Sequence, residues 1–276
     1  MRKKRKLCLL LTMYLLLCFT LPVFAATNNF ITTNNYIPGT HNIAPVTTRA
    51  SGQWIQASDG RWWYKHSDGS YTVNDWEYID GEWYHFDSQG WMQTGTLVIN
   101  KITYKLNSSG ALYYTQLPIT RERQQQTMWC WVTCARMVGK YYNPSTTKSQ
   151  SDMVTFVKGS SINKGGTDSE IKQAIEYICN KNAVANNTNL SFTEAWNEIN
   201  SGDPFIAHIS WNNTDIAGLG HAITCYAFDK ENFNGLAYFH DPWENTASYN
   251  VAYSVLLSGC SLPTGTGKCT SAIWIK

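Results

Sequence analysis

The chain has 276 residues, 43% of them hydrophobic and 15% charged, which is enough for one or two globular domains with buried cores. Its formal charge of +2 comes from the start: residues 1–25 hold five lysines and arginines and no acid, so the rest carries 17 basic against 20 acidic residues, a formal −3. This balance provides no basic field, which argues against nucleic acid as a partner.

Residues 1–25 have the pattern of a secretory signal peptide. The basic run Met1–Lys6 precedes an apolar run, Leu7–Val23, which ends in small residues at the positions that define cleavage. We expect cleavage after Ala25 or Ala26 and therefore a secreted protein with no lasting membrane anchor. The alternative is a single membrane anchor, because the apolar run is near the minimum of ~17 residues for crossing a bilayer.

The next two segments predict a linker and a repeat domain. Residues 26–50 are rich in Asn and Thr and indicate a flexible linker. Within residues 51–115, segment 59–69 aligns with segment 80–90 at a 21-residue step, and segment 100–110 repeats the pattern more weakly. Each unit predicts a β-hairpin that cannot bury its apolar face alone, so the hairpins should stack as a solenoid, capped by the third unit.

These units resemble the choline-binding or cell-wall-binding repeats of Gram-positive surface proteins and their glucan-binding relatives. The resemblance implies an aromatic cage that binds a quaternary ammonium by cation–π attraction of ~0.5–2 kcal/mol per ring. The expected partner is cell-wall choline or glycan, and the alternative is that the rings only pack hairpin against hairpin. The candidate ligand-binding residues are Trp62, Trp63, Trp76, Tyr78, Trp83, Tyr84 and Trp91.

The reactive groups are expected in residues 116–276, beginning with a cysteine at a helix start. Cys130 opens a run in which Val132, Ala135 and Val138 recur at helical spacing. Free backbone N–H groups and the helix dipole favour the thiolate at the first turn, and the thiolate is the nucleophilic form. Cys134 lies one turn deeper in apolar surroundings, so Cys130 is the favoured nucleophile.

Further helices and strands follow. A short helix is predicted at 151–157 and an amphipathic one at 168–179, and a third is predicted after Ser191, which forms a capping box with Glu194. Alternation predicts strands at 205–211, 221–228 and 236–240, the last two as an antiparallel hairpin.

This hairpin would bring His221, at the start of one strand, beside Asp241, after the end of the other. The carboxylate could then hold one imidazole nitrogen while the other faces Cys130. His240 should point to the opposite face of the sheet, and His208 is expected to be a strand or core residue.

The segments WCWVTCARMVG, GHAITCYAFD and AYFHDPW, in this order, resemble the papain-like cysteine peptidases of bacteria, in the branch of secreted effector proteases and bacteriocin-leader peptidases. The resemblance covers residues 116–276 and implies an α+β domain with a helical N-terminal part and an antiparallel sheet. It also implies a Cys130–His221–Asp241 triad without metal or cofactor. Gln124, six residues before Cys130, would donate to the oxyanion, although Gln125 and Gln126 are solvated alternatives in the same run.

Other roles for the cysteines are weaker. Cys130 and Cys134 have no second pair that would complete a zinc site. In a secreted protein, Cys260 and Cys269, on either side of a Pro-, Gly- and Thr-rich loop, are the predicted disulfide.

The sequence therefore predicts a secreted, wall-associated cysteine endopeptidase acting on a protein or peptide, built from a β-hairpin solenoid and an α+β papain-like domain. Two alternatives remain open: a thiol-dependent peptidoglycan amidase or endopeptidase, and a surface adhesin with a degenerate peptidase domain.

Overall fold

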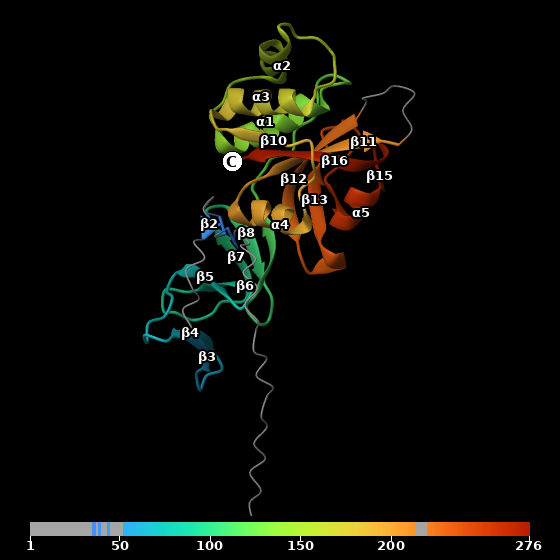
Figure 1. Cartoon of the computed structure of the whole chain (residues 1–276). Helices are drawn as coiled ribbons and strands as arrows, with labels where there is room; N and C mark the ends of the chain where they lie inside the picture. The colour runs from blue at the N-terminus through green and yellow to red at the C-terminus, as the bar shows by residue number, and fades with distance from the viewer. Residues whose placement is uncertain (1–34, 37, 40–42, 45–51, 213–219) are drawn as a thin grey trace, which may run out of the picture. The chain divides into compact units, whose positions relative to one another are not determined.

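The computed structural model describes residues 35–36, 38–39, 43–44, 52–212 and 220–276. These residues belong to one unit, residues 34–276. Helices and antiparallel strands are both present (Figure 1), as the predicted α+β class requires. The predicted signal peptide lies outside the described residues, and none of the described helices has the length and apolar character needed to cross a membrane.

Three antiparallel hairpins follow the predicted repeat. β3 (Gly52–Gln56) pairs with β4 (Trp62–His66), β5 (Asp75–Ile79) with β6 (Glu82–Phe86), and β7 (Gly95–Ile99) with β8 (Ile102–Leu106). The turn of the second hairpin has φ of 52° at Asp80 and 95° at Gly81. This left-handed backbone favours Asp, Asn and Gly, so Asp80 and Gly81 suit the two-residue turn between β5 and β6.

The third hairpin continues into a larger sheet. β9 (Leu112–Gln116) pairs with β8 on one side and with β12 (Gly220–Asp229) on the other. The strand order along this sheet is β10-β16-β11-β12-β9-β8-β7. The hydrogen-bonded ladder is therefore continuous across residue 115, where the sequence analysis places a domain boundary, and that boundary stays a prediction.

Two short pieces of the predicted linker are also described. β1 (Asn35–Tyr36) pairs with β2 (Ile43–Ala44), and the backbone N–H of Gly39 donates to the carbonyl of Asn200 at 2.9 Å. The other residues predicted as linker, up to residue 51, lie outside the described part of the chain.

Four of the five described α-helices form where capping and periodicity predicted them, and the last and shortest was not predicted. They are α1 (Cys130–Tyr142), α2 (Gln150–Lys158), α3 (Asp168–Cys179), α4 (Phe192–Ser201) and the short α5 (Tyr253–Ser258). A capping box starts each of α2, α3 and α4. The helix predicted at 168–179 is confirmed residue for residue, because its cap and its apolar stripe are both local features.

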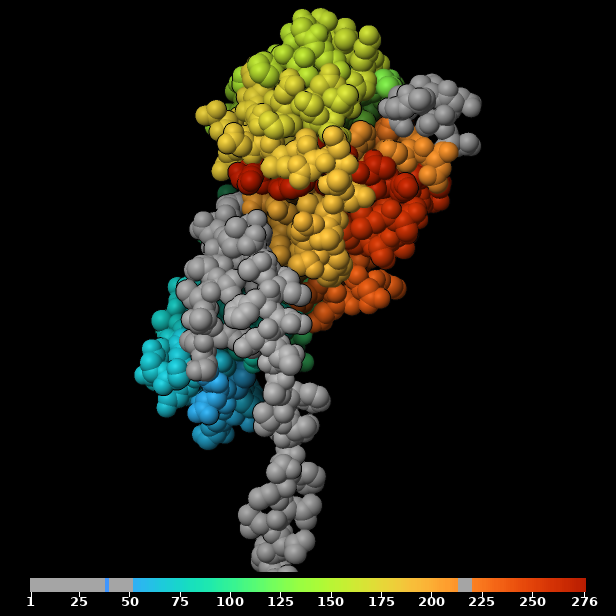
Figure 2. All heavy atoms as spheres, viewed as in Figure 1, coloured from blue at the N-terminus to red at the C-terminus, as the bar shows by residue number. Residues whose placement is uncertain are grey.

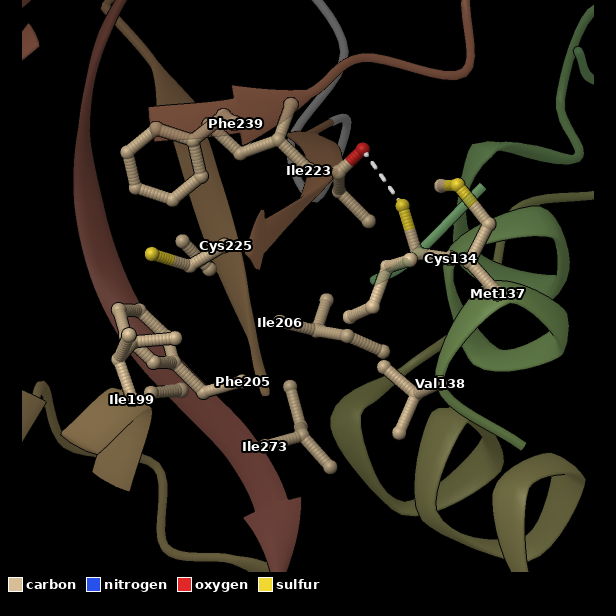
Figure 3. Packing of buried hydrophobic residues seen from close by; sticks show 14 of the residues in the cluster. Cys134, Met137, Val138, Ile199, Phe205, Ile206, Ile223, Cys225, Phe239 and Ile273 are labelled. Carbon is tan, nitrogen blue, oxygen red and sulfur yellow. Dashed lines mark hydrogen bonds between the residues drawn. The ribbon is translucent and has the colours of Figure 1, made fainter. Parts of the chain in front are cut away.

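Packing of α1 against the sheet sets the position of the helix start. Figure 3 shows Cys134, Met137 and Val138 of α1 facing Ile206, Ile223 and Ile273 from three neighbouring strands. All six side chains are buried, and the Cys134 thiol donates to the carbonyl of Ala222 at 3.2 Å. The first residue of α1 is thereby held beside the start of β12.

The C-terminal strand is a central element that sequence analysis missed. β16 (Gly265–Ile275) lies between β10 (Ala183–Ala185) and β11 (Phe205–Trp211), and it also pairs with β15 (Cys260–Leu262). In the space-filling view, red atoms of the C-terminal residues form a strip bordered by yellow atoms (Figure 2). Of the other two C-terminal strands, β13 (Leu236–His240) pairs with β12 and with β14 (Tyr249–Ala252).

The predicted Cys260–Cys269 disulfide is wrong. The register of β15 and β16 places Cys260 opposite Gly267, two residues before Cys269, and all six described cysteines are free thiols. A disulfide needs Cβ atoms about 3.8 Å apart, which favours residues directly opposite each other over such a diagonal pair. The supposed loop between these cysteines is a β-hairpin.

The cap of α4 offers a simple stability test. The Ser191 hydroxyl accepts from the backbone N–H of Glu194 at 3.2 Å, and the Glu194 carboxylate accepts from the N–H of Ser191 at 2.7 Å. Ser191→Ala is expected to lower the free energy of unfolding by about 1 kcal/mol in urea titration. Ser160→Ala, at an exposed serine outside the helices, should change it by less than about 0.5 kcal/mol. Equal effects of the two variants would contradict a stabilising cap.

Candidate active site

A cleft of about 930 Å³ lies where the start of α1 meets the start of β12. Its lining includes Cys130 and His221, together with the side chains of Trp131, Trp211 and Trp243. Two residues predicted to react together, 91 positions apart in the chain, therefore share one concave surface. The cleft is large enough to hold several residues of a peptide.

Cys130 is the first residue of α1 and is partly exposed to the cleft. The residue before it, Trp129, provides no side-chain hydrogen bond to the helix start. The first backbone N–H groups of a helix have no intrahelical acceptor, so this end presents donors and a positive partial charge beside the sulfur. Cys134 is fully buried instead, and burial raises the pKa of its thiol well above the usual value.

His221 connects the cysteine to the carboxylate. Its Nε2 lies 2.9 Å from Oδ1 of Asp241, and the side chains are 6% and 0% exposed. Burial disfavours the imidazolium, but hydrogen bonds to Asp241 and Cys130 and their charges outweigh it and raise the His221 pKa to about 9. Because Nε2 is taken by Asp241, Nδ1 is the nitrogen left for Cys130.

Asp241 is ionised despite its burial. Burial alone would raise its pKa, but the hydrogen bond and charge of His221 hold the pKa of Asp241 below the usual value. Two further donors assist: the backbone N–H of Trp243 at 2.9 Å from Oδ1, and the hydroxyl of Tyr249 at 3.2 Å from Oδ2. A carboxylate with this many donors keeps a fixed orientation toward the imidazole.

Arg121 secures the loop that carries Asp241. Its Nε donates to the carbonyl of Asp241 and its Nη2 to that of Trp243, each at 2.6 Å. Neither Arg121 nor Tyr249 was singled out from the sequence, because nothing local marks an arginine that contacts a residue 120 positions away.

The ring of Trp211 stacks on His221, with centroids 5.8 Å apart and planes inclined by 17°. This indole lies nearly parallel to the imidazole at one side of the cleft. Trp211 is the last residue of β11, next to β12 in the sheet, so the stacking follows from strand pairing.

The other two described histidines of this region differ in their contacts. His240 is buried, its Nε2 donates to the carbonyl of Ile119 at 2.9 Å, and its Nδ1 lies 2.6 Å from the Ser248 hydroxyl. His208 was expected as a strand or core residue; it does lie in β11, but its side chain is 23% exposed and lines the cleft.

Gln124 lies beside the cleft rather than in its lining. Both of its amide hydrogens are donated to backbone carbonyls, those of Gln126 and Thr127, each at 2.9 Å. The side chain lines an adjoining hollow that shares Thr127 and Trp243 with the cleft. Its carbonyl oxygen is buried without a hydrogen-bond partner among the described residues. The structure thus brings Cys130, His221 and Asp241 together and leaves Gln124 at the margin.

The aromatic residues of the hairpins divide into two groups. Trp63 and Trp91 line a hollow of about 290 Å³ together with Tyr71, which the sequence analysis did not select. The Arg61 guanidinium lies over the Trp91 ring, 3.9 Å from its centroid. This hollow is the one place where two of the seven predicted ligand-binding rings line a common cavity among those described.

The other predicted rings have different surroundings. Trp83 is buried at 6% exposure, and Trp76 packs edge-on against Tyr104 with centroids 5.0 Å apart. Tyr78 contacts Trp83 and Tyr84 contacts Trp54, with centroids 5.2 Å and 4.9 Å apart respectively. Trp62 is 37% exposed and is not among the residues that line the hollow.

The described residues contain no group of three or more His, Cys, Asp or Glu side chains arranged to hold a metal ion.

Known solved structures resemble separate parts of the chain. The choline-binding domain of a Streptococcus pneumoniae protein is 30% identical over 22% of this chain and 82% of its own, with a TM-score of 0.21. Choline-binding protein F of the same organism is 31% identical over 28% and 23%, also with a TM-score of 0.21. A protein from Bacillus anthracis described as a C39-like peptidase is 13% identical over 58% and 94%, with a TM-score of 0.40.

No curated protein matches the chain. The model of the Peptidase_C39 like family matches residues 116–258, which is more than half of the 276 residues and includes Cys130, His221 and Asp241. The chain belongs to the Peptidase_C39 like family and is, at that level, a cysteine peptidase.

Proposed function

We propose that the protein is a secreted, cell-wall-associated endopeptidase of the papain-like type, which hydrolyses peptide bonds with Cys130, His221 and Asp241. The observation that carries this proposal is the imidazole of His221, which is hydrogen-bonded to Asp241 and lies close enough to Cys130 for that thiol to help raise its pKa, in a cleft open to a peptide. Nucleophile, base and orienting group in one chain of contacts are the requirements of thiol catalysis.

The first half of the reaction forms a thioester. His221 holds the proton of Cys130, so the thiolate attacks the carbonyl carbon and a tetrahedral oxyanion forms. The imidazolium then donates its Nδ1 proton to the leaving amine, the C–N bond breaks, and the acyl group remains on the sulfur. Asp241 keeps the ring oriented and stabilises its positive charge throughout.

The second half releases the acid. Neutral His221 takes a proton from a water molecule, whose oxygen attacks the thioester carbonyl. The tetrahedral intermediate collapses, the C–S bond breaks, and the Cys130 thiolate and His221 imidazolium are restored with a carboxylic acid product. Both halves use the same two atoms, Sγ and Nδ1, so no cofactor is required.

The oxyanion is stabilised at the start of α1. The backbone N–H of Cys130 belongs to the first turn, where intrahelical acceptors are lacking, and the helix dipole adds a positive partial charge. Gln124 would supply a second donor by exchanging one loop carbonyl for the oxyanion.

The choice between a protein-cleaving and a wall-cleaving enzyme is open to one experiment. Purified protein is incubated with an unfolded protein such as reduced casein, and in parallel with purified Gram-positive cell walls. We expect new peptide termini from the casein and no fall in wall turbidity. Clearing of the walls without casein cleavage would favour the amidase or endopeptidase of peptidoglycan instead.

We further propose that residues 51–115 retain the enzyme at the wall by binding quaternary ammonium groups, and that residues 1–25 direct its export. Support comes from the hollow formed by Trp63, Tyr71 and Trp91. Because the guanidinium of Arg61 lies over Trp91, this ring face accommodates a cation, and a choline ammonium would take the free ring faces or displace Arg61.

Removing two rings should release the protein from choline. We expect Trp63→Ala combined with Trp91→Ala to weaken binding to choline-agarose by about tenfold or more, because each ring contributes ~0.5–2 kcal/mol of cation–π attraction. Phe233→Ala, which removes an exposed ring outside the hollow, serves as the control. Undiminished retention of the double variant would contradict this binding site and leave the peptidase proposal untouched.

A further inference from the structure

The cleft contains a second histidine–carboxylate pair that the reaction does not use. Nδ1 of His208 lies 2.5 Å from Oδ1 of Asp168, the first residue of α3. The two side chains are 23% and 11% exposed, so the pair is largely enclosed but reachable from the cleft. Its geometry parallels that of His221 and Asp241, yet it comes from β11 and α3 rather than from β12 and the loop after β13.

The carboxylate behind His208 is ionised. Burial by itself would raise the pKa of Asp168, but hydrogen bonds from His208 and Ser271 lower it below the usual value. An ionised carboxylate can only accept, so the His208 proton resides on Nδ1 and the ring orientation is fixed. Nε2 has no hydrogen-bond partner among the described residues and remains the functional end of the ring.

Gly220 keeps this nitrogen accessible next to the reacting groups. A Cβ atom at Gly220 would lie only 2.8 Å from Nε2 of His208, so any side chain there would crowd the ring. Gly220 directly precedes His221, and both residues line the cleft with His208. Nε2 of His208 therefore lies beside the backbone of Gly220, the residue that directly precedes His221, and faces the same cleft.

The charges of the residues that line the cleft favour an anionic substrate side chain. The described residues that line the cleft include Lys164, His208 and His221, and none of them is acidic. The carboxylates of Asp168 and Asp241 lie behind their histidines and are 11% and 0% exposed. A cationic substrate side chain would find no carboxylate among the described residues of this lining, whereas an anionic one could pair with His208.

We infer that His208, oriented by Asp168, forms a subsite for an acidic side chain of the substrate, close to the bond that is cleaved. The doubly protonated ring presents Nε2–H, which donates to the carboxylate oxygen of the substrate. Asp168 balances the ring charge from behind, so the subsite pairs two carboxylates with one imidazolium. This inference rests on the proposed peptidase function and specifies its substrate class.

A cleavage-site survey with a mixed peptide library tests the inference across all side chains at once. The library is digested with the full mature chain, and the cleaved bonds are mapped by mass spectrometry. We expect Asp and Glu to be enriched at one position near the cleaved bond. Synthetic peptides with Glu or Gln at that position should differ in kcat/KM by about tenfold or more, as a charge-assisted hydrogen bond predicts.

Two variants locate the effect. His208→Leu should bring the Glu-to-Gln ratio of kcat/KM close to one, and Asp168→Asn should lower it as well, because the ring loses its orienting charge. Lys172→Gln removes a positive charge from the exposed side of the same helix α3 and should leave the ratio at the wild-type value. Thermal unfolding of each variant checks that it is folded.

The possible results distinguish failure of the acidic subsite from failure of the proposed peptidase function. Cleavage without enrichment of acidic residues, or enrichment that persists in His208→Leu, overturns the subsite and leaves the peptidase standing. Absence of all cleavage by the wild-type chain contradicts the peptidase itself, and the subsite with it.

Discussion

Cys130→Ala is expected to lower kcat/KM for peptide hydrolysis by about 10⁴-fold or more, because removal of the nucleophile leaves only binding and oxyanion stabilisation. The substitution is small and lies at a partly exposed helix start, so the fold should survive. Cleavage is followed by the appearance of new amino termini, with circular dichroism as the check on folding.

The matched control is a second partly exposed cysteine at the other end of the helical region. Cys179 closes α3, and its thiol donates to the carbonyl of Ile175 at 3.2 Å, within its own helix. Cys179→Ala should retain peptide hydrolysis. Activity that survives in the Cys130 variant but is lost in the Cys179 variant would place the nucleophile elsewhere.

Asp241→Asn is expected to lower kcat/KM by about 10²- to 10⁴-fold, because the neutral amide does not stabilise the positive charge of the imidazolium. The volume is conserved, and the contacts of Tyr249 and Trp243 at this position can remain. A larger effect on kcat than on KM would show that the carboxylate acts on the reaction rather than on substrate binding.

The same variant should change the alkaline limb of the pH profile. With the His221 pKa raised to about 9, the wild-type imidazolium persists to that pH and activity falls above it. Loss of the Asp241 charge removes a cause of the rise, so the falling limb of the variant should move to lower pH. An unchanged limb would mean that His221 does not carry the ionisation that limits activity.

The raised pKa of His221 also makes the free energy of unfolding depend on pH. The folded-state pKa of His221 lies above its ordinary value of 6.5, so folding is favoured by its proton. That contribution is complete below the ordinary value and is lost as pH rises through about 9. Asp241→Asn should therefore flatten the pH dependence of unfolding in this window.

Local signals predicted the elements that carry the site. The helix at 168–179 and the strands at 205–211 and 236–240 have the predicted bounds because capping residues and alternation are encoded within each segment. The approach of His221 to Asp241 followed from a hairpin of two such strands. In each case the information lay within about twenty residues of the position concerned.

Contacts between distant segments could not be predicted in this way. The pairing of His208 with Asp168 joins positions 40 residues apart, and Arg121 reaches a loop 120 residues downstream. β16 was missed because its value as a central strand depends on β10 and β11, which flank it only in the folded chain. Such pairings depend on how helices and strands pack, which periodicity does not encode.

The tryptophans of the repeats also show that local sequence does not determine tertiary contacts. Trp62 and Trp83 occupy equivalent repeat positions, yet Trp62 is 37% exposed and Trp83 only 6%. Trp83 packs into the cluster that includes Ile102 and Tyr104 of the next hairpin. The sequence identifies aromatic residues that could bind a ligand, but packing against the neighbouring hairpin determines which of them stay exposed to bind it.

We propose that Cys130 is the reactive one of the six described thiols, because His221 and the helix start act on it. The other five are poor candidates, since burial raises the pKa of Cys134, Cys179, Cys225, Cys260 and Cys269. The direct test is to treat the mature protein at neutral pH with one equivalent of a thiol-directed epoxide, and then to map the modified peptide and the remaining activity. The account predicts label on Cys130 alone and loss of hydrolysis in proportion to labelling. Modification of another cysteine with equal loss of activity, or labelled Cys130 in an enzyme that still cleaves peptides, would contradict it.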